Sequence, residues 1–373
     1  MSATIHERQL GVYLHVPFCS VRCDYCAFAT WTDKAELMGD YVDAVLVEIE
    51  RARCDGQLVP ASTLFLGGGT PSLLSPRDIS RLIAAVELAP FAEVTVECNP
   101  ESMTPELMRA LRAVGVTRIS IGVQSLHPHV LSGLGRPHVA GSVERALHLI
   151  EEGGFESFNV DLVFGGAGET AADWAATLSG VLEMSPRPPH ISAYALTVEP
   201  GTPLAATPDR HPDDDAQASR YEVLDSILAA KGYEWYEISN YAMPGHACRH
   251  NQSCWRQEDY LGFGCAAHSH VAGHRFANVW NIERYLERIR QGRSPIASED
   301  FLDEGRRAAE ALELGIRTAA GVTRAALSAE DLDALGDLVQ VSDDRIMLTL
   351  RGRLLCNEVS LRLRTRSALT SFA

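Results

Sequence analysis

The sequence lacks the features of a membrane-spanning, an exported or a nucleic-acid-binding protein. It has no run of about 18 consecutive apolar residues, the minimum for a transmembrane helix. The amino-terminal stretch MSATIHERQLGVYLHVPFC has no apolar signal core with a small-residue cleavage site, so we expect a cytoplasmic protein. Positive charge is scarce: 33 Lys and Arg against 49 Asp and Glu give a net charge of −16. This balance argues against nucleic acid or an anionic membrane as the main partner.

Internal repeats, low-complexity tracts and linker-like stretches are also missing. The 373 residues, 46% of them hydrophobic and 22% charged, have the composition of an ordinary globular protein. This length predicts two domains, or one large α/β domain with an appendage.

Short β-rich runs alternate with helical patterns from residue 12 to about residue 232, which predicts repeated βα units around a parallel sheet. The strand candidates are VYLHV from Val12, STLFLG from Ser62, EVTVEC from Glu93, RISIGVQ from Arg118, FNVDLVFG from Phe158 and HISAYAL from His190. Ser75 and Thr104 each precede a proline and are expected to cap helices, and Gly115 and Gly153 stand where helices should stop. Six units predict an open (β/α)6 partial TIM barrel whose working face is the carboxyl end of the strands. A doubly wound sheet is the alternative topology.

The rest of the chain departs from this repeat. We expect a core barrel over residues 1–240, an irregular His- and Cys-rich segment over 241–298, and a carboxyl-terminal extension over 299–373. In the extension, the helical patterns EGRRAAEALELGIRT and TRAALSAEDLDAL precede two strand-like runs, RIMLTL and EVSLRL. Two helices and a β-hairpin predict a helical, winged-helix-like unit.

Three of the nine cysteines fall close together, as Cys19, Cys23 and Cys26, in a C-x3-C-x2-C pattern that directly follows the first strand. Cysteines of a cytoplasmic protein are typical of metal or redox chemistry rather than of disulfides. A four-iron cluster with only three protein ligands would leave one iron open to an exogenous molecule. A structural zinc site and unrelated free thiols are the alternatives, although this spacing is not a usual zinc pairing.

The run YLHVPFCSVRCDYCAF resembles the signature of the radical S-adenosylmethionine superfamily. Within it, the form Y-x-H-[IV]-P-F-C-x3-C-x-Y-C is similar to the oxygen-independent coproporphyrinogen III oxidase family, over nearly the whole chain. The resemblance implies a [4Fe–4S] cluster on the three cysteines, whose open iron binds the methionine part of S-adenosylmethionine. It also implies an electron donor such as a flavodoxin or a ferredoxin.

The same resemblance implies a set of cofactor-binding residues. The glycine-rich end of the second strand, GGGTP, allows close backbone approach to a ligand and offers N–H groups. Polar residues at the ends of the next three strands, and an arginine in the LGRPH motif, match positions that contact the cofactor. The residues expected to bind it are Tyr13, Tyr25, Gly68, Gly69, Thr70, Glu97, Gln124, Arg136, Asp161 and Ala195.

Two branches of the family share this pocket, one of oxidases and one of heme chaperones. The oxidases usually carry a further cysteine two positions after the third ligand, where this sequence has Phe28. The chaperone branch resembles the chain at LGRPH, at YLGFGCAAHSH and in its H-N-x-x-Y-W motif, present here as HNQSCW with Cys254 in place of the tyrosine. His250 and Cys254 are the candidate heme ligands.

We therefore predict a heme-binding protein that delivers heme to acceptor proteins, with membrane-associated respiratory proteins among the candidates. Oxidative decarboxylation of coproporphyrinogen is the alternative, so whether the chain is an enzyme stays open. A methyltransferase acting on a tetrapyrrole is a third possibility on the same scaffold.

Overall fold

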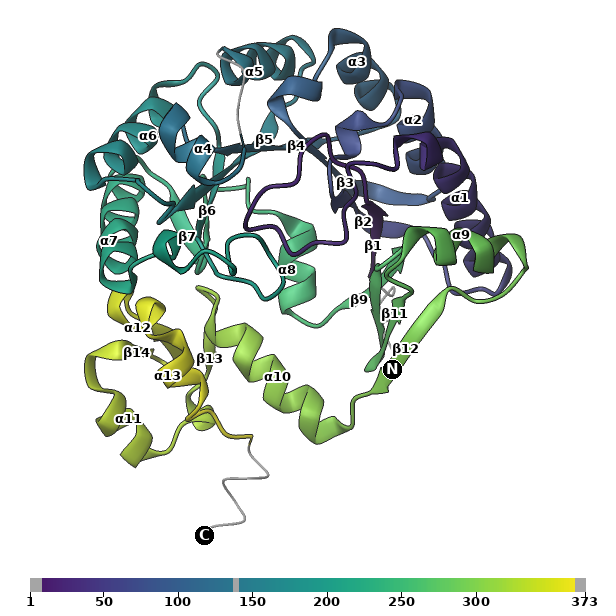
Figure 1. Cartoon of the computed structure of the whole chain (residues 1–373). Helices are drawn as coiled ribbons and strands as arrows, with labels where there is room; N and C mark the ends of the chain where they lie inside the picture. Colours follow the sequence, from purple (N-terminus) through teal and green to yellow (C-terminus); the bar gives the residue numbers. More distant parts are fainter. Residues whose placement is uncertain (1–8, 137–140, 366–373) are drawn as a thin grey trace.

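The computed structural model describes residues 9–136 and 141–365. Its centre is an open arc of six parallel strands with helices on the outer side (Figure 1). Each of the six expected strands forms, and neighbouring strands pair in the order of the sequence. The strands are β1 (Leu10–Val16), β2 (Ala61–Gly68), β3 (Leu88–Cys98), β4 (Arg118–Gln124), β5 (Ser157–Phe164) and β6 (His190–Ala195). The prediction of an open α/β barrel is thus confirmed.

The outer helices begin at the expected caps. The side chains of Ser75 and Thr104 each accept a hydrogen bond of 3.1 Å from the third helical N–H, at the first turns of α2 and α3. The helices are α1 (Met38–Cys54), α2 (Pro76–Ala84), α3 (Pro105–Ala113), α4 (Pro128–Gly133), α5 (Ser142–Glu152), α6 (Ala171–Glu183) and α7 (Asp214–Ala230). Short 3-10 turns lie at η1 (Ala35–Leu37), η2 (Pro71–Leu73), η3 (Pro100–Ser102), η4 (Pro208–Arg210), η5 (Arg324–Ala326) and η6 (Gly336–Leu338).

The segment 241–298 is regular, contrary to the expectation. It extends the barrel sheet, because β9 pairs parallel with β1 and is followed by an antiparallel meander, while β8 and β7 extend the other edge. The elements are β7 (Glu234–Glu237), β8 (Asn240–Ala242), α8 (Arg249–Trp255), β9 (Asp259–Phe263), β10 (His268–Val271), β11 (His274–Asn278), α9 (Ile282–Arg290) and β12 (Ile296–Phe301). The expected irregularity was wrong because these strands are short and the first of the meander, β9, pairs with the distant β1, as Leu10 with Asp259, which no local pattern reveals.

The carboxyl-terminal extension has its own small core and three-stranded antiparallel sheet. Its elements are α10 (Glu304–Ile316), β13 (Val322–Thr323), α11 (Ala329–Leu335), β14 (Val339–Ser342), β15 (Arg345–Leu348), α12 (Leu350–Leu354) and α13 (Cys356–Ser360). A hairpin forms, but the partner of β15 is β14; the expected strand EVSLRL instead contributes to α13 and the turn after it. Buried Val359 fixes the face of that short helix, so tertiary packing overrides a weak strand pattern.

The six barrel strands alternate between two kinds of side chain. One set is apolar and packs beneath the outer helices; Leu64, Leu66 and Val94 are examples, all at most 1% exposed. The other set is largely polar and points into the barrel, as Thr95, Glu97 and their neighbours do. Because successive residues of a strand face opposite sides, alternate residues in the sequence belong either to the apolar core under the helices or to the interior of the barrel.

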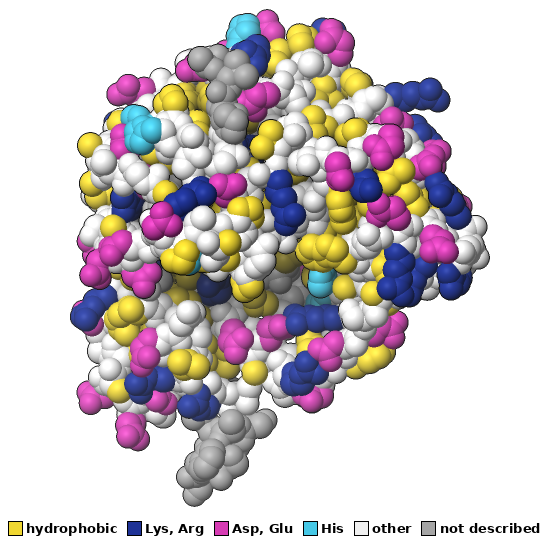
Figure 2. All heavy atoms as spheres, in the orientation of Figure 1, with side chains coloured by type: hydrophobic (Ala, Val, Ile, Leu, Met, Phe, Trp, Pro, Cys, Tyr) yellow, Lys and Arg dark blue, Asp and Glu magenta, His cyan; other side chains and the backbone are white. Residues whose placement is uncertain are grey.

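Figure 1 looks into the barrel: the loop between β1 and η1 crosses its mouth, and α8 lies inside the arc. On the same face, charged side chains of both signs are scattered around a central hollow instead of forming one basic patch (Figure 2). Among the described residues, no helix combines the length and apolarity that crossing a membrane requires.

Candidate functional site

The three clustered cysteines lie on the loop between β1 and η1 and share one cavity of about 680 Å³. The loop is pinned by backbone hydrogen bonds, from Cys19 N to Trp31 O (3.0 Å) and from Cys26 N to Cys23 O (3.1 Å). Burial raises the pKa of the Cys19 and Cys26 thiols. A set of three thiols converging at a cavity wall fits a cluster with one open iron, because the open position then faces the cavity.

Two polar side chains from other loops, after β2 and after α4, contact these sulfurs. The Thr70 hydroxyl lies 3.7 Å from Cys19 Sγ, and Nη1 of Arg136 lies 3.7 Å from Cys23 Sγ. Hydrogen bonds to ligand sulfurs are a usual means of tuning a thiolate-bound cluster. The donor set around the cysteines therefore also fits an iron–sulfur centre.

Nine of the ten residues expected to bind the cofactor line this same cavity. They are Tyr25, Gly68, Gly69, Thr70, Glu97, Gln124, Arg136, Asp161 and Ala195. Tyr13 does not join them: its side chain lines an adjoining cavity, with its hydroxyl 3.0 Å from His15 Nδ1. The parallel strands explain the convergence, because their carboxyl ends meet at one edge of the sheet.

The glycine-rich end of β2 acts differently from the expectation. Its N–H groups are already used: Gly68 N donates to Glu97 Oε2 (3.1 Å), Gly69 N to Val16 O (2.8 Å) and Thr70 N to Phe18 O (2.7 Å). A Cβ at Gly69 would lie 2.6 Å from Phe18 O, and Gly68 has φ +106°. The glycines are needed so that β2 can pack against the start of the cysteine loop, and they do not offer free donors.

Arg136 is held by a network that the sequence did not reveal. Nη2 donates to Asn99 Oδ1 (2.5 Å) and to Gly122 O (3.1 Å), and Asn99 Nδ2 donates to Thr70 Oγ1 (3.1 Å). Asn99 thus joins the arginine to the threonine across the cavity floor. The position of Asn99 directly after β3 is the feature of the sequence that could have indicated this role. A guanidinium held in this way is oriented to receive a carboxylate.

Two half-buried carboxyl groups of the interior, Glu97 and Asp161, line both this cavity and the adjoining one. Burial, and then the nearby Asp161, raise the pKa of Glu97 to about 8. Burial also raises the pKa of Asp161, although Ser120 Oγ (3.1 Å) and Asn159 Nδ2 (2.7 Å) donate hydrogen bonds to it. Because two carboxylates at this depth repel each other, the pair favours holding one proton near neutral pH.

Gln124 ends β4 with φ +68°, a left-handed conformation that is costly for a residue with a side chain. A Cβ placed at Gly122 would lie 2.9 Å from Gln124 Nε2 and 2.7 Å from Arg136 Nη2. Strained backbone of this kind is found where a side chain is held for function.

A second cavity, of about 540 Å³, lies deeper in the barrel and shares Glu97, Asp161, Phe28 and Tyr194 with the first. It contains both candidate heme ligands, His250 and Cys254, which α8 brings to one face at a spacing of four residues. Glu93 of β3 fixes this helix, because its carboxylate accepts hydrogen bonds from the N–H groups of Arg249 (3.1 Å) and His250 (3.0 Å). The anchoring role of Glu93 was not foreseen.

His250 is buried, with its ring stacked on Phe65 at a centroid separation of 5.2 Å. Its Nδ1 lies 2.9 Å from Thr63 Oγ1. Burial lowers the pKa of His250 to about 4, so the imidazole is neutral at pH 7. For Nε2 to offer its lone pair to a metal, Nδ1 must carry the ring proton. The hydroxyl oxygen of Thr63 then accepts the hydrogen bond from Nδ1.

Cys254 replaces the tyrosine of the motif and is half-buried. Burial raises the pKa of its thiol to about 11, which disfavours a thiolate in the protein without ligand. His250 is therefore the stronger of the two candidates. Phe28, 65% exposed, and Trp280, 56% exposed, stand at the rim of this cavity and offer two aromatic faces to a flat apolar ligand.

Comparison with known proteins agrees with this geometry. Residues 13–179 match the model of the Radical SAM superfamily. The structure is similar to that of the radical SAM enzyme coproporphyrinogen III oxidase, HemN, from Escherichia coli, with a TM-score of 0.82 over 95% of this chain and 90% of the other, at 24% identity. Fold and site thus define a radical SAM protein.

Sequence relatives narrow the assignment. Heme chaperone HemW of Mycobacterium tuberculosis is 39% identical, over 96% of this chain and 95% of the relative. The HemW proteins of Escherichia coli (39%, covering 70% of each chain) and Bacillus subtilis (31%, covering 94% and 97%) are also similar. The chain belongs to the heme chaperone HemW family. Membership of the radical SAM superfamily implies a [4Fe–4S] cluster and S-adenosylmethionine, and the donor set described above fits both.

Proposed function

We propose that this protein binds heme and delivers it to acceptor proteins in the cytoplasm. The observation that carries the proposal is the cavity lined by His250, which opens beside the cysteine cavity in a chain 39% identical to heme chaperones along almost its whole length. Fold similarity to an oxidase adds no evidence for turnover, because one scaffold hosts many functions.

Cys19, Cys23 and Cys26 would hold a [4Fe–4S] cluster, and the nine residues that line the cavity with them would hold S-adenosylmethionine. When bound, this pair supplies one-electron chemistry. Arg136 orients a carboxylate, and Thr70 and Arg136 donate hydrogen bonds toward the ligand sulfurs. An electron donor such as a flavodoxin or a ferredoxin would serve the cluster.

The heme site would lie in the second cavity. His250 Nε2 would hold the heme iron, since Thr63 contacts Nδ1 of the ring and Glu93 fixes the helix that carries it. Phe28 and Trp280 would pack on the porphyrin faces at the rim. Because this rim is exposed, the bound heme stays accessible to an acceptor, including a membrane-associated respiratory protein.

The test is anaerobic reconstitution of the full chain, followed by titration with heme. We expect a shifted Soret band in the parent protein and a changed, weaker band in His250→Ala. His211→Ala, which removes a partly exposed histidine near the cysteine loop, is the matched control and should behave as the parent. An unshifted heme spectrum in the parent would contradict the proposal.

The cluster is tested separately by iron content and absorbance. Cys19→Ser, Cys23→Ser or Cys26→Ser should each abolish the cluster, whereas Cys54→Ser and Cys356→Ser should leave iron content near that of the parent. These two cysteines lie at the end of α1 and in α13, far from the shared cavity. Loss of the cluster in a folded Cys54 or Cys356 variant would overturn the ligand assignment.

A further inference from the structure

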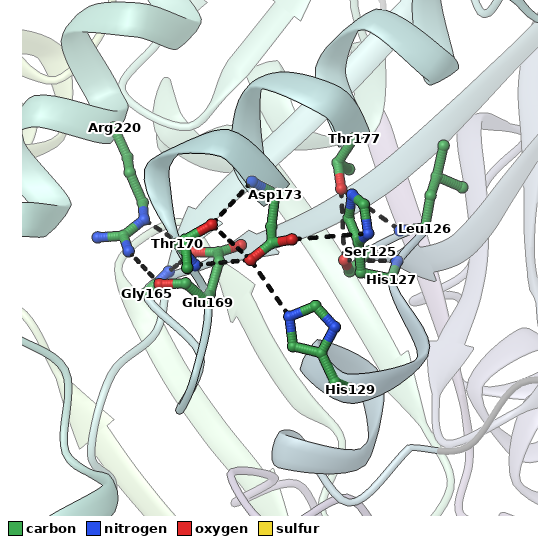
Figure 3. A network of polar contacts seen from close by, with 10 residues as sticks. All are labelled: Ser125, Leu126, His127, His129, Gly165, Glu169, Thr170, Asp173, Thr177 and Arg220. Atoms are coloured by element: carbon green, nitrogen blue, oxygen red, sulfur yellow. Dashed lines mark hydrogen bonds and ion pairs between the residues drawn. The ribbon is translucent and has the colours of Figure 1, made fainter.

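Two histidines and an aspartate meet at a place that the heme and cofactor sites do not use. His127 and His129 lie at the start of α4, and Asp173 lies in the first turn of α6. Figure 3 shows dashed lines from the Asp173 carboxylate to both imidazole rings, His127 beside it and His129 below it. Each side chain offers one ligand atom, and the three atoms lie within 4.8 Å of one another.

The separations suit a small divalent ion. His129 Nε2 lies 3.2 Å from Asp173 Oδ2, and His127 Nδ1 lies 3.7 Å from Asp173 Oδ1. Metal–nitrogen and metal–oxygen bonds of about 2.0–2.2 Å in a tetrahedron put ligand atoms about 3.3–3.6 Å apart. The first separation lies just below this range and the second just above it, but they run to the two different oxygens of the carboxylate; the half-exposed His129 ring has room to turn from Oδ2 toward Oδ1.

The carboxylate is prepared for such an ion. Thr170 N (2.8 Å) and Thr170 Oγ1 (2.7 Å) both donate hydrogen bonds to Asp173 Oδ2. Asp173 Oδ1 faces His127 Nδ1 across 3.7 Å. A ligand carboxylate oriented by hydrogen bonds to its other oxygen is the arrangement seen around metal sites.

A capping role explains only part of this arrangement. The reciprocal capping box between Thr170 and Asp173 accounts for Oδ2 at the start of α6. It does not require two imidazoles from another loop. Nor would two imidazoles gather at one carboxylate for a single ion pair, because their positive forms repel each other at a ring separation of 5.8 Å.

We propose that His127, His129 and Asp173 bind a divalent transition-metal ion of the Zn²⁺ type, with solvent in the fourth position. Imidazole nitrogen and carboxylate oxygen are ligands that Zn²⁺ accepts, and three protein ligands leave one open position.

The site joins two loops at the carboxyl edge of the barrel. Its histidines begin the short helix α4, and Arg136 follows that helix, bonded through its N–H to Leu131 O (2.9 Å). At the other end of α4, Gly133 packs against Ala167 O, where a Cβ would lie only 2.6 Å away. A bound metal would therefore hold the start of α4 against the first turn of α6, while Gly133 holds its end against the loop before α6. Together these attachments would stiffen the segment that carries Arg136.

The experiment uses tag-free full-length protein with its iron–sulfur cluster already reconstituted, so that the three cluster cysteines do not compete for the added metal. After incubation with ZnCl2 and desalting, zinc and iron are measured per chain, and Co²⁺ is titrated as a spectroscopic probe. We expect one Zn²⁺ per chain beyond the cluster iron, and Co²⁺ visible bands without the intense thiolate-to-metal absorption of sulfur ligands.

Asp173→Asn and His127→Gln should each weaken Zn²⁺ binding by about tenfold or more. The control is His148→Gln. His148 pairs with Glu152 across one helical turn (3.2 Å), and among the described residues no third metal-ligating side chain joins this pair. That variant should bind as the parent does. Thermal melting without metal checks folding, and His129→Gln gives an independent test should the Asp173 variant unfold.

Zinc should also slow amide exchange in residues 125–136 of the parent and not in the variants. Absence of tight zinc beyond the cluster, or equal binding by the parent and the His127→Gln and His129→Gln proteins, would overturn the proposal.

Discussion

The two faces of the barrel strands differ in what holds them. Beneath the outer helices, the strands present an apolar layer, with Leu14, Leu64 and Val96 fully buried. Inside the arc, the alternate positions carry buried polar groups, such as Thr95, Glu97 and Asp161, which line cavities instead of packing. The outer face gives the fold its stability, whereas the inner face gives up stability to keep polar groups available for ligands.

The loss of burial energy on the inner face is partly offset by internal hydrogen bonds. Asn159, for example, donates to Asp161 Oδ1 (2.7 Å) and to Ser120 Oγ (2.9 Å) and accepts from Ser192 Oγ (3.2 Å). Such networks orient side chains at a cost in adaptability. Functional residues should therefore be sought among the polar residues at the alternate strand positions that face the inside of the barrel.

The sharpest test of this contrast compares neighbouring residues on the two faces. Leu64→Ala on the outer face should lower the free energy of unfolding by about 2–5 kcal/mol, because it leaves a cavity in the core. Thr95→Val on the inner face should be neutral or stabilising by up to about 1 kcal/mol, since the hydroxyl is buried with no hydrogen-bond partner among the described residues. Chemical denaturation of the reconstituted proteins measures both. Equal losses would remove the distinction between the faces.

Arg136 should matter to ligand binding far more than to folding. Arg136→Ala removes the contacts with Asn99, Gly122 O and Cys23 Sγ. A lost charge-assisted contact costs about 1.5–3 kcal/mol, or about 10- to 150-fold in S-adenosylmethionine affinity. Anaerobic calorimetry should show this loss, with exposed Arg109→Ala as the unaffected control. Parent-like affinity in Arg136→Ala would exclude the arginine from the cofactor site.

The raised pKa of Glu97 predicts that the stability of the protein depends on pH. This pKa, about 8 in the folded protein, is above its unfolded value of 4.5, so the folded state holds the proton more tightly. Stability is therefore highest below about pH 4.5 and falls as the pH rises to about 8, with a slope of up to about 1.4 kcal/mol per pH unit from this group.

Glu97→Gln should remove that slope, measured by denaturation at pH 5, 6.5 and 8 without S-adenosylmethionine. Glu106→Gln, at an exposed helix start, should keep the parent slope in the same window. Parallel profiles for parent and Glu97→Gln would show that the inner carboxyl is not held protonated.

The sequence predicted what is set locally. The six strands, the caps at Ser75 and Thr104 and the cysteine loop depend on patterns of a few residues, and all lie where expected. The placement of nine of the residues predicted to bind the cofactor around one cavity followed largely from strand ends meeting at one edge.

What failed depends on distant partners. β9 joins β1 across the chain, and α8 enters the barrel because Glu93 holds its first turn. The internal use of the Gly69 and Thr70 N–H groups depends on carbonyls of another loop. The register of Tyr13 on β1, which places it in the deeper cavity, likewise depends on the neighbouring strands. None of these contacts has a signature in neighbouring residues.

Restoring the usual residue of the chaperone motif tests the heme site with a smaller effect. Cys254→Tyr restores the residue usual in the H-N-x-x-Y-W motif and should retain heme binding, because His250 is the ligand that Thr63 orients. The absorption band of bound heme should change in shape only if the sulfur contacts the iron. Loss of heme on this change, in a folded protein, would transfer the ligand role to Cys254.

The most direct measurement of the central claim runs two assays in parallel on the same anaerobically reconstituted protein. One supplies coproporphyrinogen with S-adenosylmethionine and a reductant and follows products by chromatography; the other loads heme and follows its transfer to an apo-heme protein by absorbance. We predict heme transfer, reduced in His250→Ala, and no protoporphyrinogen. Efficient formation of protoporphyrinogen, coupled to cleavage of S-adenosylmethionine and without heme transfer, would contradict the account.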